Sequence, residues 1–207
     1  MNSDNFSFSM RIFLAINLPQ DIKERLADLQ QEIKNSFPIE AADNVAKWVT
    51  PANLHLTLLF LGEVGEREVP FLFRTVEAVV KDIPPLVLQL TKICYGPAKK
   101  IPPQFIWLET KDNKMLEKLI VDLREKVSQA GIRHDDRGEG QWFFGHITLA
   151  RIKEWIWRRI EPEERPEIEK ELDIKVEARS IDLMESRLKR SGPEYIILQS
   201  FPLLGPD

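Results

Sequence analysis

The chain has 207 residues and a mass of 24.1 kDa, and its composition is 43% apolar and 30% charged. Intrinsic disorder and a mini-protein scaffold are excluded, because a chain of this length and composition can bury a full core. Its 29 basic and 33 acidic residues give a formal charge of -4, so it lacks the bulk positive field that holds long duplex nucleic acid. The single cysteine, Cys94, forms no internal disulfide, and we expect a cytoplasmic protein.

The N-terminal segment is not typical of a targeting signal. Its first positive charge is Arg11, after a polar stretch, and only seven residues follow from Ile12 to Leu18 before a proline. This order of charges is wrong for a signal peptide, and the apolar run is too short. Nowhere does an uninterrupted apolar run approach the roughly 20 residues that a membrane span requires, so we expect no membrane partner.

Strands and helices are predicted along the whole chain. Apolar runs and alternation predict strands at 11–18, 54–62, 86–95, 105–108, 142–152, 174–184 and 195–201, with a short segment at 47–49. Apolar residues spaced by three and four predict helices at 20–37, 66–81 and 112–130. The charged stretch at 153–171 is predicted to hold a short helix and an exposed connection.

A weak internal repeat relates the two halves of the chain. Strand 11–18, helix 20–37 and a strand with His-x-Thr at 55–57 correspond to strand 105–108, helix 112–130 and a strand with His-x-Thr at 146–148. The offset is 91 to 94 residues at all three places. The repeat predicts one domain over residues 1–207, built from two similar lobes that each contribute one His-x-Thr strand.

The two His-x-Thr strands are the candidate catalytic motifs. Alternation along a strand places His55 and Thr57 on one face, and likewise His146 and Thr148. A single strand histidine is more often a packed core residue, but two at matching repeat positions favour catalysis. With an unperturbed pKa near 6.5, one imidazole acts as a base and the other as an acid near neutral pH. This pairing suits in-line displacement at phosphorus, with the threonine hydroxyls on the non-bridging oxygens.

The competing interpretation of the two histidines is a metal site. Two histidines without HxH or HExxH spacing and without an obvious third ligand make that interpretation weak, and we expect no metal and no cofactor.

These motifs also carry a family resemblance. HLTLLFLGEV at 55–64 and HITLAR at 146–151 closely resemble the two HxTx motifs of the two-histidine phosphoesterase superfamily. They look most like those of the RNA 2',3'-cyclic phosphodiesterases once called 2'-5' RNA ligases. The resemblance extends to the segments at 11–19, 102–109 and 181–203, and so over nearly the whole chain. It implies an α+β fold of two pseudo-symmetric lobes, each an antiparallel sheet backed by helices, with the active-site cleft between them.

The resemblance also implies roles for the four motif residues. His55 would be the proton donor and His146 the proton acceptor in opening a 2',3'-cyclic phosphate to a 2'-phosphate. Thr57 and Thr148 would bind the phosphate oxygens. The residues alone do not assign the two histidine roles. The implied partners are RNA ends or nucleotides with a 2',3'-cyclic phosphate, and we expect a monomer.

Two positions depart from the family pattern, and two further residues are candidates for substrate binding. Gln141 and Gly145 stand where the family commonly has Arg and Pro, so another cation is needed or the phosphate is held less tightly. Arg151 matches the family's HxTxxR, but strict alternation places it opposite His146 unless a strand end or bulge intervenes. Phe143 sits at the family's aromatic position, where stacking on a nucleobase and core packing are equally good interpretations.

Three alternatives to cyclic phosphate hydrolysis remain open. The same site suits 2'-5' RNA ligation, which joins tRNA halves, or cleavage of 2'-5' phosphodiesters. A non-catalytic module that binds RNA ends is the alternative outside enzymes. An intact acid, base and threonine pair favours catalysis, because binding alone needs cations more than it needs two imidazoles.

Overall fold

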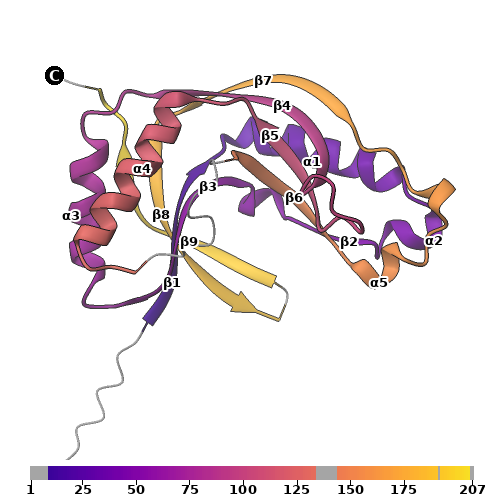
Figure 1. Ribbon diagram of the computed structural model, residues 1–207, viewed down its shortest axis with the longest axis horizontal. Helices are drawn as coiled ribbons and strands as arrows, with labels where there is room; N and C mark the ends of the chain where they lie inside the picture. The colour runs from indigo at the N-terminus through magenta and orange to yellow at the C-terminus, as the bar shows by residue number, and fades with distance from the viewer. Residues whose placement is uncertain (1–8, 134–143, 191, 206–207) are drawn as a thin grey trace, which may run out of the picture.

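The computed structural model describes residues 9–133, 144–190 and 192–205 (Figure 1). The strands are β1 (Ser9–Asn17), β2 (Ala46–Trp48), β3 (His55–Gly65), β4 (Leu86–Gly96), β5 (Phe105–Thr110), β6 (His146–Ile152), β7 (Lys170–Ala178), β8 (Ser180–Lys189) and β9 (Gly192–Pro202). The α-helices are α1 (Gln20–Asn35), α2 (Ile39–Ala42), α3 (Val69–Val80), α4 (Lys114–Gln129) and α5 (Glu154–Trp157). Short 3-10 turns cover Pro51–Asn53 and Pro162–Glu164.

The predicted α+β class with an antiparallel sheet is confirmed. In the described residues all the strands belong to one sheet, in the order β7-β4-β5-β6-β3-β1-β8-β9, with β2 paired to β6. Every neighbouring pair is antiparallel. The three long helices lie at the predicted places, and the Pro at the start of α3 occupies its first turn, where no backbone donor is needed.

One predicted strand is wrong: the segment 174–184 contains two strands, not one. Strand β7 pairs with β4 at one end of the strand order, whereas β8 pairs with β1 near the other end. The buried positions shift by one residue at the junction, from Ile174 and Val176 to Ile181 and Leu183. No glycine or proline marks the junction at Arg179, because the chain changes its pairing partner there without folding back.

The helices pack against only one face of the sheet. The apolar stripes of α1, α3 and α4 join the inward side chains of the strands in a single hydrophobic core. The other face carries a small cluster of Phe13, Ala15 and Met184, with Tyr195 packed against it. In the described part of the chain, this second face is free of helices.

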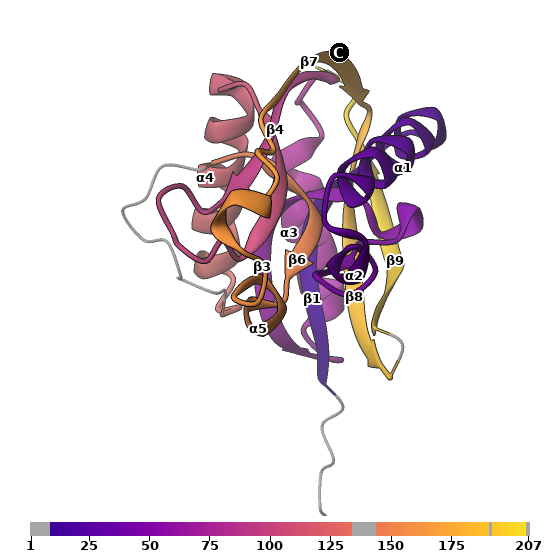
Figure 2. The ribbon, with the colours of Figure 1, turned by 90° about the vertical axis from the view of Figure 1, so that its right-hand side faces the viewer.

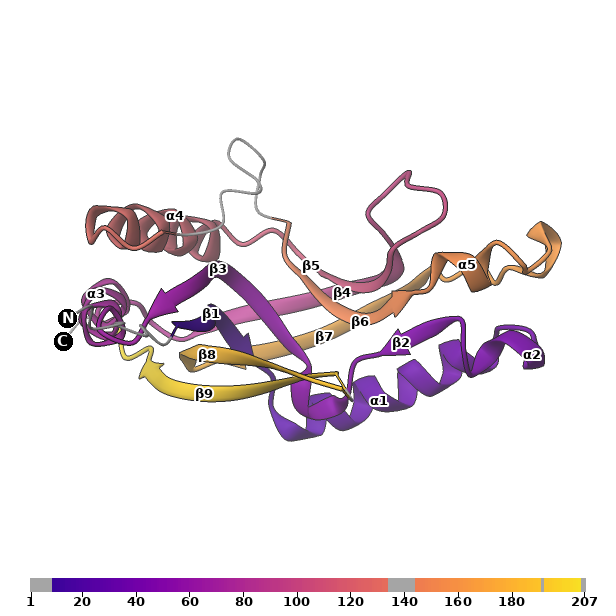
Figure 3. The ribbon, with the colours of Figure 1, turned by 90° about the horizontal axis from the view of Figure 1, so that it is seen from below.

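A single pair of residues joins the two halves of the sheet. Strands β7, β4, β5 and β6 form one half, strands β3, β1, β8 and β9 form the other, and Leu56 opposite Ile147 is the pair between β3 and β6. Figure 3 shows α3 and α4 together at one end of the molecule and α1 along the other. Figure 2, which looks along the long axis, shows α1 to the right of the strands and α4 to the left. The described residues thus form two half-sheets within one continuous sheet, and the division into two pseudo-symmetric lobes stays a prediction.

Candidate active site

The pair of Leu56 and Ile147 brings both His-x-Thr motifs onto one face. Directly opposed residues of an antiparallel pair point to the same side of the sheet. Leu56 and Ile147 are both 0% exposed, in the core beneath the helices. The side chains that flank them therefore point to the helix-free face: these are His55, Thr57, His146 and Thr148, all half-buried. Residues separated by 91 positions in the chain thus meet across the join.

The two histidines are held in the same way. Nδ1 of His55 lies 2.7 Å from the carbonyl oxygen of Asn53, and Nδ1 of His146 lies 3.0 Å from that of Phe144. Because a carbonyl only accepts, Nδ1 carries a proton in both rings and donates it. Nε2 is then the nitrogen left to exchange a proton. In His55 it lies 3.0 Å from the Thr57 hydroxyl, which can share that proton.

Aromatic side chains fix the planes of both imidazoles. The ring of His55 lies 5.1 Å from Phe13 and 5.2 Å from Tyr195, which meets it edge-on at 89°. The ring of His146 stacks on Trp107 at 4.1 Å with an interplanar angle of 28°. Such contacts hold a ring in one orientation. Neither Phe13 nor Tyr195 stands out in the sequence, because both are distant from the motifs in the chain and look like ordinary strand residues.

Burial lowers the pKa of both histidines below the usual 6.5, while the carbonyl acceptors at Nδ1 oppose that shift. The nearby charges differ between the two sites. The Lys23 ammonium lowers the pKa of His55 further, whereas the Glu109 carboxylate raises that of His146. These charges favour His146 as the protonated partner in the free protein. That is the reverse of the roles that the resemblance implies.

Strand β6 has a bulge immediately after its motif. Consecutive β5 residues Ile106 and Trp107 pair with Ala150 and Thr148, so Leu149 is an extra residue. A bulge of this kind shifts the alternation by one, so that later residues change face. The buried doublet of Leu149 and Ala150 is the mark that it leaves on the burial pattern.

Because of this bulge, Arg151 lies on the face of His146. Arg151 pairs with Phe105, and its guanidinium carbon lies 4.8 Å from the centre of the Phe105 ring. Phe105 stacks on Trp107 at 5.7 Å, and Trp107 in turn stacks on His146. The strict alternation that would have turned Arg151 away does not hold in this strand.

Strand β3 has the matching bulge in the first half. Ala15 pairs with Thr57 and Leu14 with Leu59, which leaves Leu58 as the extra residue. Leu58 precedes Leu149 by the same 91 residues that separate the two histidines. The same bulge thus recurs at the same offset in both halves of the chain, and the internal repeat itself stays a prediction. The position equivalent to Arg151 is Phe60, an exposed aromatic side chain 57% accessible to solvent.

Gln30 in α1 supports the second bulge from the helical side. Its amide Nε2 donates to the carbonyl oxygens of Leu149, at 2.8 Å, and of Val49, at 2.9 Å. Gln30 is only 7% exposed, so these bonds satisfy polar groups that water does not reach. The sequence carries a signal for this role, because Gln30 is a polar residue on the apolar stripe formed by Leu26 and Ile33.

Two of the candidate positions, Phe143 and Gln141, lie outside the described residues. Gly145 is described: it is buried, and its carbonyl accepts hydrogen bonds from the backbone and hydroxyl of Thr110 at 2.8 and 3.1 Å. Phe144, next to the predicted aromatic position, is 49% exposed and lies 6.2 Å from the His146 ring.

Two surface hollows lie elsewhere. One of about 450 Å³ is lined by residues of α3 and α4, and one of about 380 Å³ is lined by Cys94 and Glu109 among others. Neither is lined by the four motif residues, so a cleft at the motifs stays a prediction.

Within residues 9–133, 144–190 and 192–205, no three His, Cys, Asp or Glu side chains are grouped to hold a metal. No helix in that part of the chain is both long and apolar enough to cross a membrane.

A helix-backed antiparallel sheet that presents two His-x-Thr strands on one face defines a phosphoesterase of the two-histidine class. The chain belongs to the LigT-like phosphoesterase family. The model of that family, described as "LigT like Phosphoesterase", matches residues 16–107. It is 30% identical over 200 residues to the RNA 2',3'-cyclic phosphodiesterase of Thermus thermophilus, covering 95% of this chain and 91% of the relative.

Solved structures agree with this assignment. A crystal structure of a Thermus thermophilus protein superposes with a TM-score of 0.76 at 28% identity, covering 96% of this chain and 100% of that one. LigT from E. coli complexed with 3'-AMP gives a TM-score of 0.68 at 25% identity, covering 94% and 98%.

Proposed function

We propose that this phosphoesterase opens 2',3'-cyclic phosphates, on RNA ends or nucleotides, to 2'-phosphomonoesters by histidine acid-base catalysis without a metal ion. The observation that carries the proposal is the single β3–β6 pair, which sets both imidazoles and both threonine hydroxyls on one face. The names of the relatives support the substrate class, since the Thermus thermophilus relative is an RNA 2',3'-cyclic phosphodiesterase.

In the proposed mechanism, Nε2 of one neutral histidine takes a proton from water while the water oxygen attacks phosphorus. The bond from phosphorus to the 3'-oxygen breaks, and the other, charged histidine gives its Nε2 proton to that oxygen. The Thr57 and Thr148 hydroxyls donate to the non-bridging oxygens, where negative charge accumulates. From the resemblance, His55 donates and His146 accepts the proton.

A product-resolved assay tests the proposed function. The protein is incubated with a nucleoside 2',3'-cyclic phosphate in EDTA, and the two possible monophosphates are separated by chromatography. We expect the 2'-phosphate alone, formed at the same rate with and without the chelator. Absence of turnover, or the 3'-phosphate as product, would contradict the proposal, and loss of activity in EDTA would contradict its metal independence.

Two other functions of the same face are decided by companion measurements. Joining of tRNA halves, followed on a gel, reports 2'-5' ligation; we expect hydrolysis to dominate in water. Tight binding of RNA ends with no turnover between about pH 5 and 8, on either side of the ordinary histidine pKa, would instead indicate a binding module.

The pH dependence of kcat/KM follows from the pKa shifts of the two histidines. Catalysis needs one charged and one neutral imidazole, and that state is most populated between the two pKa values of the coupled pair. Since both pKa values are lowered from 6.5, we expect a bell-shaped profile with its maximum on the acid side of 6.5. Activity should already be falling before the pH reaches neutrality, because an acid whose pKa is lowered from 6.5 has lost most of its proton by then.

Removing the charge of Lys23 checks the cause of this shift. The Lys23→Gln variant should move the limb that belongs to His55 to higher pH, because the ammonium lowers the pKa of that ring. A maximum above about pH 7 in the unaltered protein, beyond the ordinary histidine pKa, would contradict the expected profile.

A further inference from the structure

Two cations lie side by side on the face that carries the histidines. Lys47 of β2 is directly opposite Arg151 of β6, so their side chains share a face, and both are exposed. Because Arg151 shares the face of His146, Lys47 does too. Like charges directly opposed on neighbouring strands repel each other and destabilise the sheet.

Neither cation is compensated within the described part of the chain. The ion pairs found there include neither Lys47 nor Arg151. The Arg151 guanidinium instead rests on the Phe105 ring, which orients it without neutralising it. Two adjacent unpaired cations form a surface that an anion stabilises.

The register of β5 and β6 gives the distance along the strands between the cation pair and the second His-x-Thr motif. Thr148 is opposite Trp107 and Arg151 is opposite Phe105, so the two rows are separated by two residues of β5. At about 3.4 Å per residue, that step is roughly 7 Å. The 3' and 5' phosphates attached to one ribose are separated by a comparable distance. A nucleotide whose reacting phosphate lies between the histidines therefore has its 5'-phosphate within reach of the cations.

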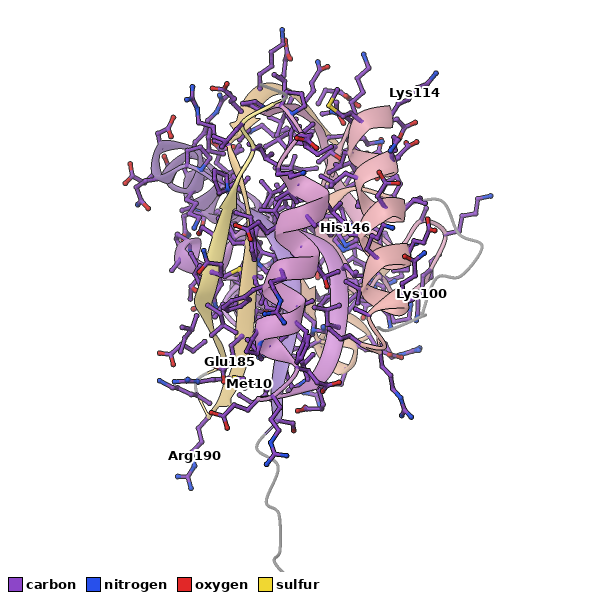
Figure 4. All side chains as sticks on the ribbon, turned by 90° about the vertical axis from the view of Figure 1, so that its left-hand side faces the viewer. Met10, Lys100, Lys114, His146, Glu185 and Arg190 are labelled. Carbon is purple, nitrogen blue, oxygen red and sulfur yellow. The ribbon has the colours of Figure 1, made fainter. Side chains whose placement is uncertain are left out.

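Strand β9, from the other half of the sheet, also lies close to Lys47 and to His55. A Cβ added to Gly192, which opens β9, would lie 2.9 Å from Nζ of Lys47, so the ammonium lies against that backbone. Tyr195, three residues further along, packs on His55. On the same hairpin, Lys189 pairs with Glu194. Figure 4 shows Arg190 extending outward from the tip, away from the sheet.

We propose that Lys47 and Arg151 form a second phosphate site, which binds the 5'-phosphate of the nucleoside that carries the cyclic phosphate. The substrate class is then an RNA end or a 5'-phosphorylated nucleotide, in preference to a nucleoside cyclic phosphate without a 5'-phosphate. This inference rests on the proposed function and adds to it the feature by which substrates are distinguished.

The test compares adenosine 2',3'-cyclic phosphate with its 5'-phosphorylated form, using kcat/KM for each. We expect the unaltered protein to prefer the 5'-phosphorylated substrate. Lys47→Gln should reduce that preference by about fivefold, the upper range for one solvent-exposed charge pair, and Lys47→Arg should retain it. The preference should also weaken with added salt, and less steeply in Lys47→Gln.

Lys114→Gln is the matched control. Lys114 is an exposed lysine that opens α4, and Figure 4 shows it pointing away from the body of the protein. We expect its preference and basal activity to be unchanged. Equal turnover of the two substrates by the unaltered protein, or an equal loss on both in Lys47→Gln, would overturn the second phosphate site alone. Turnover of neither substrate would instead reject the proposed function.

Discussion

Replacement of either His55 or His146 by alanine is expected to lower kcat/KM for a nucleoside 2',3'-cyclic phosphate by about 10²- to 10⁴-fold, the usual contribution of a general acid or base. Each ring offers Nε2 to the reaction, because Nδ1 is committed to a backbone carbonyl. The measurement is steady-state kinetics in EDTA, with thermal unfolding alongside. A loss below about tenfold in a stably folded variant would remove that histidine from the proposed mechanism.

The same variants assign the acid and the base. On bis(p-nitrophenyl) phosphate the leaving group needs no proton, so loss of the acid should cost little and loss of the base should retain its full effect. The resemblance predicts that His55→Ala is the tolerated change. The charges of Lys23 and Glu109 favour the opposite result, with His146→Ala tolerated. The two expectations are therefore separated by one substrate and two variants.

Thr57→Val and Thr148→Val are each expected to lower kcat by about 10²- to 10³-fold, as does loss of one donor to a developing oxyanion. Valine keeps the branched shape that suits a strand, so the change removes the hydroxyl with little effect on packing. Thr57→Val carries a second effect, because it also removes the hydroxyl 3.0 Å from Nε2 of His55. Its pH profile should therefore shift, whereas that of Thr148→Val should not.

Serine variants and a distant threonine complete the comparison. Thr57→Ser and Thr148→Ser should recover most of the activity, because the hydroxyl is restored. Thr75→Val, on α3, removes a hydroxyl that bonds only to the backbone of its own helix, and it should leave kcat unchanged. If both motif variants keep more than a third of the activity, the hydroxyls do not bind the phosphate.

The sequence predicts that the two residues of each motif share a face of the sheet, because this depends only on local alternation along a strand. His55 and Thr57 point the same way in any regular strand, and so do His146 and Thr148. The position of Arg151 depends on the bulge at Leu149, which exists only through pairing with β5. Consecutive apolar residues at Leu149 and Ala150 were its only trace in the sequence.

Other features depended on contacts between distant parts of the chain. Lys47 belongs to a strand of three residues, too short to show alternation, and its partner Arg151 lies more than a hundred residues away. Likewise, the break between β7 and β8 comes from a change of pairing partner, which leaves no turn residue to recognise. Periodicity reports which face is buried, but it does not report which strand lies alongside.

The single pair of Leu56 and Ile147 between β3 and β6 has a consequence for how the reaction is confined. Each half-sheet contributes one imidazole and one hydroxyl, so neither half alone has the two imidazoles that the proposed mechanism needs. A joint one residue pair wide restrains rotation of the halves less than a full ladder of hydrogen bonds does. The spacing between the two imidazoles therefore depends also on the single hydrophobic core that both half-sheets share. Substitutions in that core are expected to alter the proposed reaction without changing any of the four motif side chains.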